Sequence, residues 1–205
     1  MDLQAVIFDY GEVLSGPPDP EAHRELLAIA GVPEEPFEKA YWVHRLDYDA
    51  DILNGQTYWQ TVARDTGANF TAEQIAQLLE VDARMWGNLN PAMIAWIPRI
   101  KAAGFRLGIL SNMGHGVLEY LRPRFSWLDQ FDQLTWSCDL RVVKPDPAIY
   151  RHVAEILRQP PTALMSVGDD PRNDVEGPRK AGWQAMQIER PKRDLWTAVR
   201  AVTGR

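Results

Sequence analysis

The sequence has a single cysteine, Cys138, among its 205 residues. An internal disulfide and a cysteine-rich zinc module are therefore excluded, and we interpret Cys138 as a buried small residue of an apolar strand. The histidines are also few, and no two of them have the spacing of paired metal ligands. They lie at positions 23, 44, 115 and 152. We consequently expect no histidine-bound transition metal.

Long apolar runs and an excess of basic residues are also missing. No stretch approaches the roughly 18 apolar residues of a membrane-spanning helix. Residues 1–5 lack the basic and apolar regions of a signal peptide. The formal net charge of −6 argues against binding to the phosphate backbone of nucleic acids. We therefore expect a cytoplasmic protein with neither a membrane nor a nucleic acid as its partner.

The negative charge is concentrated in one part of the chain. Residues 15–90 contain thirteen acidic and five basic residues, whereas the remainder is nearly balanced. This segment shows helical periodicity at 20–30, 34–48, 56–67 and 71–86, without a convincing strand. The change in composition and pattern predicts a separate helical unit within one small protein.

The rest of the chain alternates between strand-like and helical patterns. Short apolar runs lie at 3–8, 105–110, 134–138, 163–167 and 183–188. Helical patterns lie at 91–103, 114–122, 147–158 and 172–181. Such alternation indicates right-handed crossovers and a parallel sheet. We therefore predict an α/β fold with a doubly wound, five-stranded parallel sheet, formed by 1–14 and 91–205, and a small all-helical domain at 15–90.

Polar residues follow four of the predicted strands, where open α/β sheets bind their ligands. They are Asp9, Ser111 with Asn112, Lys144, and Asp169 with Asp170 and Asp174. Carboxylates that converge at one edge repel each other unless a cation joins them. Oxygen ligands without histidine suit Mg²⁺, which binds through one or two carboxylates and a phosphate. A lysine and a hydroxyl beside them could hold phosphoryl oxygens.

These four motifs, in this order and over essentially the whole chain, resemble those of the haloacid dehalogenase superfamily, in its phosphatase-like branch with a helical cap. The resemblance implies that Asp9 is a nucleophile that forms an aspartyl-phosphate. It implies phosphate binding by Ser111, Asn112 and Lys144, and it makes Ser111 and Lys144 catalytic together with Asp9. It further implies that Asp9, the carbonyl of Gly11, Asp169 and Asp174 hold Mg²⁺. The substrate would be a small phosphorylated metabolite, and the protein a monomer or homodimer.

One position departs from the family pattern. The second aspartate, which protonates the leaving group two residues after the nucleophile, is Gly11 here. The loss of such general acid catalysis costs about 10²–10⁴-fold in rate. Glu12 is the nearest acidic substitute, and its side chain could equally point to solvent. The missing aspartate predicts that good leaving groups react faster.

The same departure leaves two alternatives open. Metal-independent 2-haloacid dehalogenases of the superfamily also lack the second aspartate, although their fourth motif is less acidic than Asp169, Asp170 and Asp174. A catalytically weak protein that binds a phosphorylated ligand is the other alternative.

Several residues near these motifs are expected to have structural roles. Asp170 is expected to cap a helix, and His115 to pack or face solvent. The sequence does not separate cap-core aromatics from those that face a substrate among Tyr41, Trp42, Tyr48, Tyr58, Trp59 and Trp86.

Overall fold

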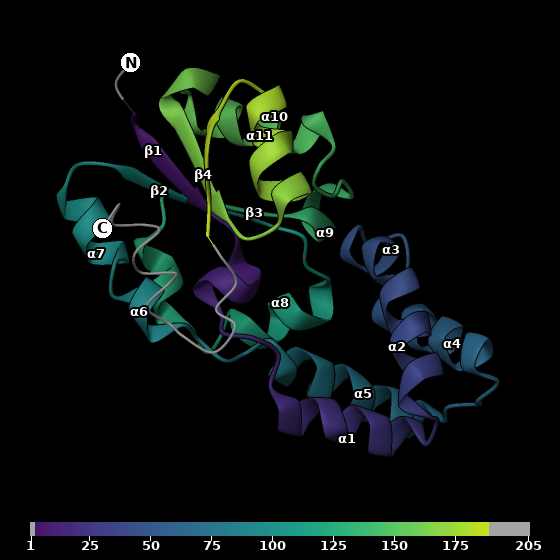
Figure 1. Ribbon diagram of the computed structural model, residues 1–205. Coiled ribbons are helices and arrows are strands. Elements are labelled where there is room, and N and C mark those ends of the chain that lie inside the picture. The colour runs from purple at the N-terminus through teal and green to yellow at the C-terminus, as the bar shows by residue number, and fades with distance from the viewer. Residues whose placement is uncertain (1–2, 189–205) are drawn as a thin grey trace.

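The five predicted strands form one parallel sheet in the computed structural model, which describes residues 3–188. The strands are β1 (Ala5–Phe8), β2 (Arg106–Ser111), β3 (Gln133–Trp136), β4 (Leu164–Gly168) and β5 (Gln184–Gln187). Their order in space is β3-β2-β1-β4-β5, so the chain reverses its direction of winding at β1 (Figure 1). This confirms the predicted doubly wound α/β fold. Residues 1–2 and 189–205 of the predicted core lie outside the described residues.

Helices cover both faces of the sheet because successive strand residues point to opposite sides. The helices outside 15–90 in the described chain are α6 (Pro91–Ile94), α7 (Ile97–Ala102), α8 (His115–Leu121), α9 (Ser137–Leu140), α10 (Pro147–Leu157) and α11 (Gly177–Lys180). Val6 and Phe8 pack in a cluster with α7 and α8, whereas Ala5 and Ile7 pack in another cluster with α10. A kinked turn occurs at Tyr10–Leu14, and short helical turns occur at Ser126–Gln130, Pro161–Ala163 and Pro171–Glu176.

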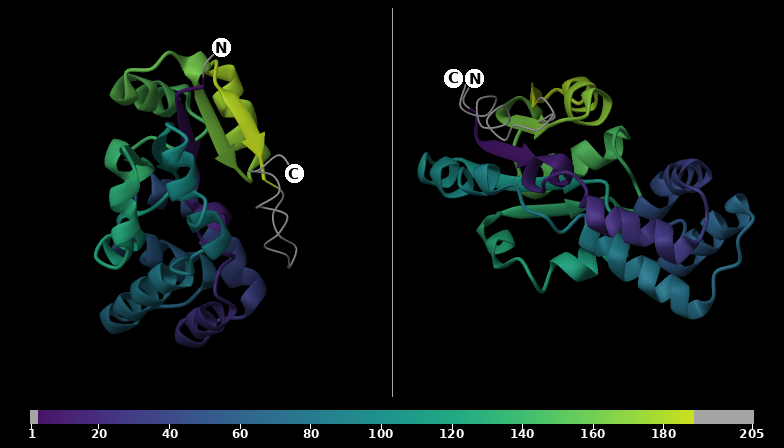
Figure 2. Two further views of the ribbon diagram at one scale, coloured as in Figure 1. Left: turned by 90° about the vertical axis from the view of Figure 1, so that its left-hand side faces the viewer. Right: turned by 60° about the horizontal axis from the view of Figure 1, so that its bottom comes forward.

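A helical lobe lies beside the carboxyl edge of the sheet (Figures 1 and 2). It consists of α1 (Pro20–Ala30), α2 (Glu34–Val43), α3 (Arg45–Asp49), α4 (Gly55–Thr66) and α5 (Ala72–Met85). Asp19 caps α1, and Thr71 forms a capping box with Gln74 at the start of α5. The lobe has a hydrophobic cluster of its own, built around Phe37, Tyr58 and Trp59.

Four predicted elements differ in their ends or continuity. The helices predicted at 34–48 and 91–103 are each two helices, and 172–181 is a wide turn followed by α11. Pro98 and Pro178 lie in the first turns of α7 and α11, the positions where a residue without an N–H fits a helix. The strand predicted at 134–138 ends at Trp136, because its partner β2 ends at Ser111. Cys138 is therefore buried in the short helix α9, not in a strand.

No helix within residues 3–188 is both long and apolar enough to cross a membrane.

Candidate active site

The carboxyl edge of the sheet brings Asp9, Ser111 and Asp169 together. Phe8 pairs with Ile109 on one side and with Val167 on the other, so the residues that follow these strands emerge side by side. Asp9 directly follows β1, and its Oδ1 accepts a 2.8 Å hydrogen bond from the backbone N–H of Tyr10. Oxygens of Asp9, Asp169 and Asp174 all lie within 4.8 Å of one another. The predicted convergence of carboxylates is present in the structure.

Lys144 lies between two of these carboxylates. Its Nζ is 2.7 Å from Oδ1 of Asp174 and 3.0 Å from Oδ1 of Asp9. The lysine side chain is only 3% exposed and that of Asp174 only 2%, so solvent screens these charges weakly. Burial alone would lower the pKa of Lys144, but Asp174 and Asp9 raise it well above its ordinary value. The lysine is therefore held as a cation.

One lysine does not neutralise all the carboxylates. Burial raises the pKa of Asp174 to about 7 and Asp9 adds to the rise, although Lys144 opposes it. The pKa values of Lys144 and Asp174 rise for different reasons: the two carboxylates raise that of the lysine, whereas burial raises that of Asp174. A further acid, Asp169, is only 6% exposed and lies next to them. The cluster carries an excess of negative charge that a divalent cation could offset.

The turn after β4 gives its three aspartates different positions. Asp170 accepts hydrogen bonds from the backbone N–H groups of Arg172 and Asn173, so it caps this turn as the sequence suggested. Its own N–H donates to Oδ2 of Asp174 at 3.1 Å. Gly168 permits this arrangement, because a Cβ there would lie 2.3 Å from the side chain of Asp174. Asp169 is thus left facing the pocket.

Asn112 positions the lysine segment. Its Oδ1 accepts a 2.7 Å hydrogen bond from the N–H of Lys144, and its Nδ2 donates to the carbonyl of Lys144 at 3.2 Å. The side-chain amide is therefore engaged within the protein. Ser111, at the end of β2, is buried and lines the pocket beside it. Asn112 itself lines the pocket, and its contact with the Lys144 backbone was not predicted from the sequence.

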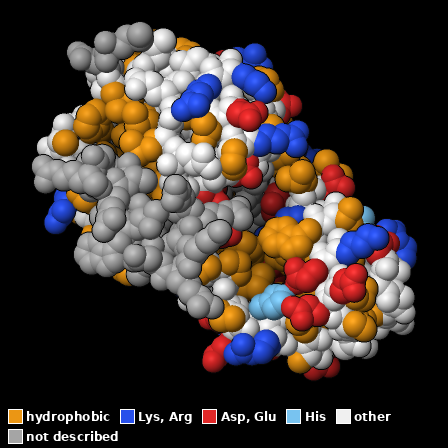
Figure 3. Space-filling model, viewed as in Figure 1, with side chains coloured by type: hydrophobic (Ala, Val, Ile, Leu, Met, Phe, Trp, Pro, Cys, Tyr) orange, Lys and Arg blue, Asp and Glu red, His pale blue; other side chains and the backbone are white. Residues whose placement is uncertain are grey.

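A cavity of about 440 Å³ lies over this edge, between the core and the helical lobe. Charged and hydrophobic side chains meet along this junction (Figure 3). The core lines it with Asp9, Tyr10, Gly11, Glu12, Ser111, Asn112, Met113, Val117, Lys144, Asp169, Asp170 and Asn173. The lobe contributes Pro18, Trp42, Arg45, Asp49 and Trp86. Of the aromatics in question, Trp42 and Trp86 therefore face the cavity, whereas Tyr58 and Trp59 are fully buried in the lobe.

Arg45 is the basic residue that the sequence reasoning missed. It is 8% exposed, and its guanidinium donates to Asp49 at 3.2 Å and to Asp82 at 3.1 Å. The guanidinium also lies 5.2 Å from the ring centres of Tyr41 and Tyr48. The spacing of Tyr41, Arg45 and Asp49 at every fourth residue was a signal in the sequence, since such residues share a helix face. The contact with Asp82 comes from α5 and had no local signal.

Comparisons with known proteins place the chain in one family. Residues 3–182 match the haloacid dehalogenase-like hydrolases. Relatives include a phosphoglycolate phosphatase of Psychrobacter arcticus, 26% identical over 92% of this chain and 84% of its own length. A phosphatase of Mycobacterium tuberculosis is also 26% identical, over 93% of this chain and 89% of its own length.

Solved structures show the same fold at lower sequence identity. An enzyme of this family from Bacteroides thetaiotaomicron, solved with magnesium and inorganic phosphate, has a TM-score of 0.76. It is 14% identical and covers 93% of this chain and 96% of its own. An L-2-haloacid dehalogenase of Xanthobacter autotrophicus has a TM-score of 0.67 at 19% identity, covering 98% of this chain and 88% of its own. The chain described here belongs to the haloacid dehalogenase-like hydrolase family.

Proposed function

We propose that this enzyme is a Mg²⁺-dependent phosphatase that hydrolyses a small phosphorylated metabolite through an aspartyl-phosphate on Asp9. The observation that carries the proposal is the group of Asp9, Asp169 and Asp174, with oxygens within 4.8 Å of one another beside the buried Lys144. Phosphatase relatives and a structural neighbour solved with magnesium and phosphate support it.

The donor set fits Mg²⁺ because it consists of oxygens and carries excess negative charge. Asp9, Asp169 and the carbonyl of Gly11 would hold the ion directly. Both oxygens of Asp174 already accept hydrogen bonds, from Lys144 and from the N–H of Asp170, so we assign Asp174 a contact through water. When bound, the ion would shield the anionic phosphate from these carboxylates.

The chain supplies the nucleophile and the groups that hold the phosphate. An oxygen of Asp9 attacks phosphorus, the P–O bond to the leaving group breaks, and water then cleaves the acyl-phosphate to release inorganic phosphate. Lys144 is bonded to Asp9 and fixes the direction of that carboxylate. The Ser111 hydroxyl and the Asn112 backbone N–H would hold phosphoryl oxygens as charge spreads over them in the transition state.

The leaving group receives little help from the turn after β1. Gly11 has no side chain to supply a proton, and Glu12, which also lines the pocket, has a left-handed backbone with φ of 54°. We therefore propose that leaving groups that depart without protonation, such as aryl and acyl groups, react fastest.

We also propose that residues 15–90 form a cap domain over a core made of 1–14 and 91–205. The chain crosses between the two at neighbouring points, because Ser15 forms a β-bridge with Leu89. The cavity lies between these two parts and includes Trp42 and Trp86 from the lobe. The cap would therefore select the leaving group, while the core holds the phosphate. A cytoplasmic location and a monomeric or homodimeric state belong to the same proposal.

The test is hydrolysis of p-nitrophenyl phosphate by the metal-free protein, with and without added Mg²⁺. We expect turnover that requires Mg²⁺ and is lost in Asp9→Asn. The matched control is Asp129→Asn, because Asp129 is exposed and lies away from the pocket. This variant should keep full activity. Turnover of 2-haloacids without metal would replace the phosphatase proposal by dehalogenation. Phosphate binding with no turnover of either substrate would leave a binding protein.

A further inference from the structure

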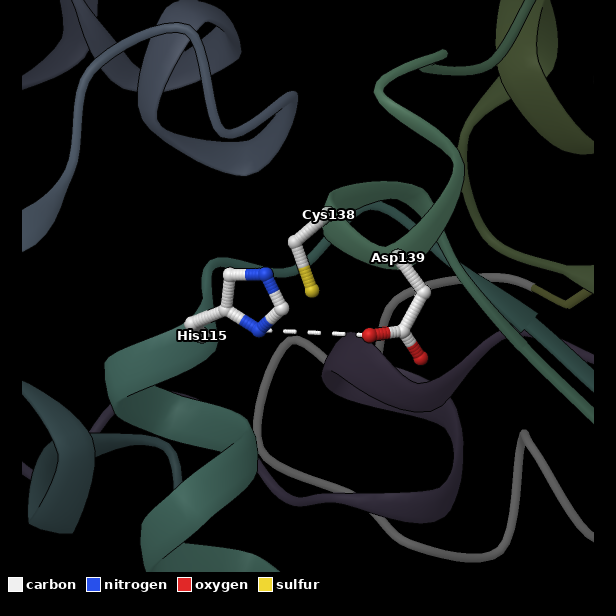
Figure 4. A group of neighbouring side chains, drawn as sticks. All are labelled: His115, Cys138 and Asp139. Carbon is white, nitrogen blue, oxygen red and sulfur yellow. Dashed lines mark ion pairs between the residues drawn. The ribbon is translucent and has the colours of Figure 1, made fainter.

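A second group of metal-ligating side chains lies outside the cavity, at the junction of α8 and α9. His115 begins α8, whereas Cys138 and Asp139 belong to α9. Figure 4 shows the imidazole, the thiol and the carboxylate pointing toward one another. Ligand atoms of the three residues lie within 4.8 Å of one another. The two helices follow neighbouring strands, so the fold brings together residues that the sequence separates.

The ligand atoms are too far apart for direct hydrogen bonds and slightly farther apart than two donors on one metal ion. Nδ1 of His115 is 3.9 Å from Oδ1 of Asp139, which is too long for a direct hydrogen bond. Two donors on one tetrahedral Zn²⁺ lie about 3.3–3.6 Å apart, given bond lengths of about 2.0–2.3 Å. Small rotations of the His115 and Asp139 side chains, each 42% exposed, would close the remaining distance. The thiol belongs to a residue that is only 2% exposed and therefore forms the inner end of the group.

Two further charged residues, Asp51 and Arg122, lie near these three. The other imidazole nitrogen, Nε2, lies 3.9 Å from Oδ1 of Asp51, in the loop after α3 of the helical lobe. Metal-bound histidines commonly direct their second nitrogen at a carboxylate. Nη2 of Arg122 lies 3.2 Å from Oδ2 of Asp139. The other carboxylate oxygen, Oδ1, is directed at His115.

We propose that His115 Nδ1, Cys138 Sγ and Asp139 Oδ1 form a binding site for Zn²⁺ or a similar borderline-soft divalent cation, with a fourth position open to water. The nitrogen and sulfur donors distinguish this site from the all-oxygen cluster at Asp9, since thiolate and imidazole favour Zn²⁺ over Mg²⁺. Binding replaces the S–H bond of Cys138 by a sulfur–metal bond, and the proton passes to the buffer.

The site also connects the two parts of the molecule. Asp51 belongs to the helical lobe, whereas the three ligands belong to the core. The side chain of Arg141, which follows α9, donates to the backbone carbonyl of Asp51 at 2.8 Å, so this loop is already docked beside the site. A cation on His115 would strengthen the attraction between its ring and the Asp51 carboxylate. Zn²⁺ is therefore expected to hold the lobe more firmly on the core and to raise the Tm.

The experiment uses Co²⁺ as a spectroscopic substitute for Zn²⁺, with the untagged, metal-free, full-length protein in excess Mg²⁺. Cys138 is the sole cysteine of the chain, so a thiolate-to-cobalt charge-transfer absorption in the near ultraviolet reports on this site alone. We expect this band to saturate at one Co²⁺ per chain and to disappear when Zn²⁺ is added. His115→Ala and Asp139→Asn should each weaken Co²⁺ binding at least tenfold, and Cys138→Ser should abolish the band.

His152→Ala, a histidine on α10 away from the site, is the control and should bind Co²⁺ as the wild type does. Asp51→Asn should weaken binding about 10–100-fold, as expected for a residue that orients a ligand. Asp139 is exposed, so its variant reports on the site even if Cys138→Ser does not fold. Co²⁺ binding without the thiolate band, no binding, or equal affinity in the wild type, His115→Ala and Asp139→Asn would each overturn the proposal. None of these readouts depends on phosphatase activity.

Discussion

The hydroxyl of Ser137 donates a 2.6 Å hydrogen bond to the backbone carbonyl of Asp49, 88 residues earlier in the chain. The same Oγ accepts a 2.8 Å hydrogen bond from the N–H of Met113. Ser137 is completely buried, and it joins the end of α3 in the helical lobe to the loop that follows β2 and contains Asn112 and Met113. The position of the lobe and the position of the loop after β2 are therefore linked through one side chain.

Ser137→Ala should weaken this link. The substitution leaves a buried N–H and a buried carbonyl without a partner, which costs about 1–3 kcal/mol of stability. We expect a lower Tm and a lower kcat/KM for p-nitrophenyl phosphate, although Ser137 does not line the cavity. Ser126→Ala, an exposed serine, is the control. An unchanged kcat/KM with a lowered Tm would show that the lobe position does not affect catalysis.

Lys144→Met should reveal the charge imbalance of the cluster. Removal of one partner from a buried ion pair typically costs about 3–5 kcal/mol. We expect the variant to lose turnover and, in EDTA, to unfold at a much lower urea concentration than the wild type. Mg²⁺ would then be the main positive charge facing Asp9 and Asp174. Added Mg²⁺ should therefore raise the free energy of unfolding of the variant more than that of the wild type.

The control for Lys144→Met is Lys180→Met, whose side chain is 78% exposed. Equal stabilisation of the wild type and Lys144→Met by Mg²⁺ would contradict the role of these carboxylates in holding the ion.

The residues at the carboxyl edge of the sheet could be predicted from the sequence. The contacts between elements that are distant in the sequence could not. Asp9 and Asp169 follow buried apolar runs, and parallel strands place such residues side by side whatever surrounds them. The end of β3 was mispredicted because it depends on where the neighbouring strand β2 ends. The sequence of residues 134–138 carries no information about that. The contacts of Arg45 with Asp82 and of Ser137 with Asp49 were missed for the same reason, since the residues of each pair are distant in sequence.

Gly11→Asp should change how the rate depends on the leaving group. A Cβ at Gly11 would meet no atom within 4 Å, and its φ of −62° and ψ of 129° suit any residue. An aspartic acid there could protonate the departing oxygen. We expect kcat for alkyl phosphates to rise by up to about 10²–10⁴-fold, with little change for p-nitrophenyl phosphate. Gly11→Asn, which has the same shape but no acidic proton, should give no gain. A gain in the Asn variant would assign the effect to geometry.

Arg45 predicts the charge of the preferred substrate. Its guanidinium is bonded to Asp49 and Asp82, so two carboxylates already face the one lobe cation that lines the cavity within the described residues. Recognition of a substrate carboxylate there would require breaking a buried ion pair. We expect kcat/KM for 2-hydroxyethyl phosphate to exceed that for phosphoglycolate, a molecule of similar size, at least tenfold. A preference for phosphoglycolate would show that Arg45 exchanges its partners for substrate.

Asp49 should make stability depend on pH in an unusual direction. Burial raises the pKa of this carboxyl from 3.8 to about 6, although Arg45 opposes the rise and Asp82 adds to it. The folded protein then binds the Asp49 proton more tightly than the unfolded chain does. The contribution of this group to stability is complete below about pH 4 and is lost as the pH rises toward about 6. The loss is about 1.4 kcal/mol per pH unit, or roughly 3 kcal/mol in all.

Asp49→Asn isolates this contribution from those of other acids. We expect the free energy of unfolding of the wild type, relative to that of the variant, to fall between about pH 4 and pH 6 and then stay constant. Urea unfolding across this range measures it. Asp47→Asn, on the exposed side of the same helix, controls for the loss of one formal charge. If the difference between wild type and Asp49→Asn instead grows with pH, the pair with Arg45 outweighs burial and Asp49 is ionised throughout.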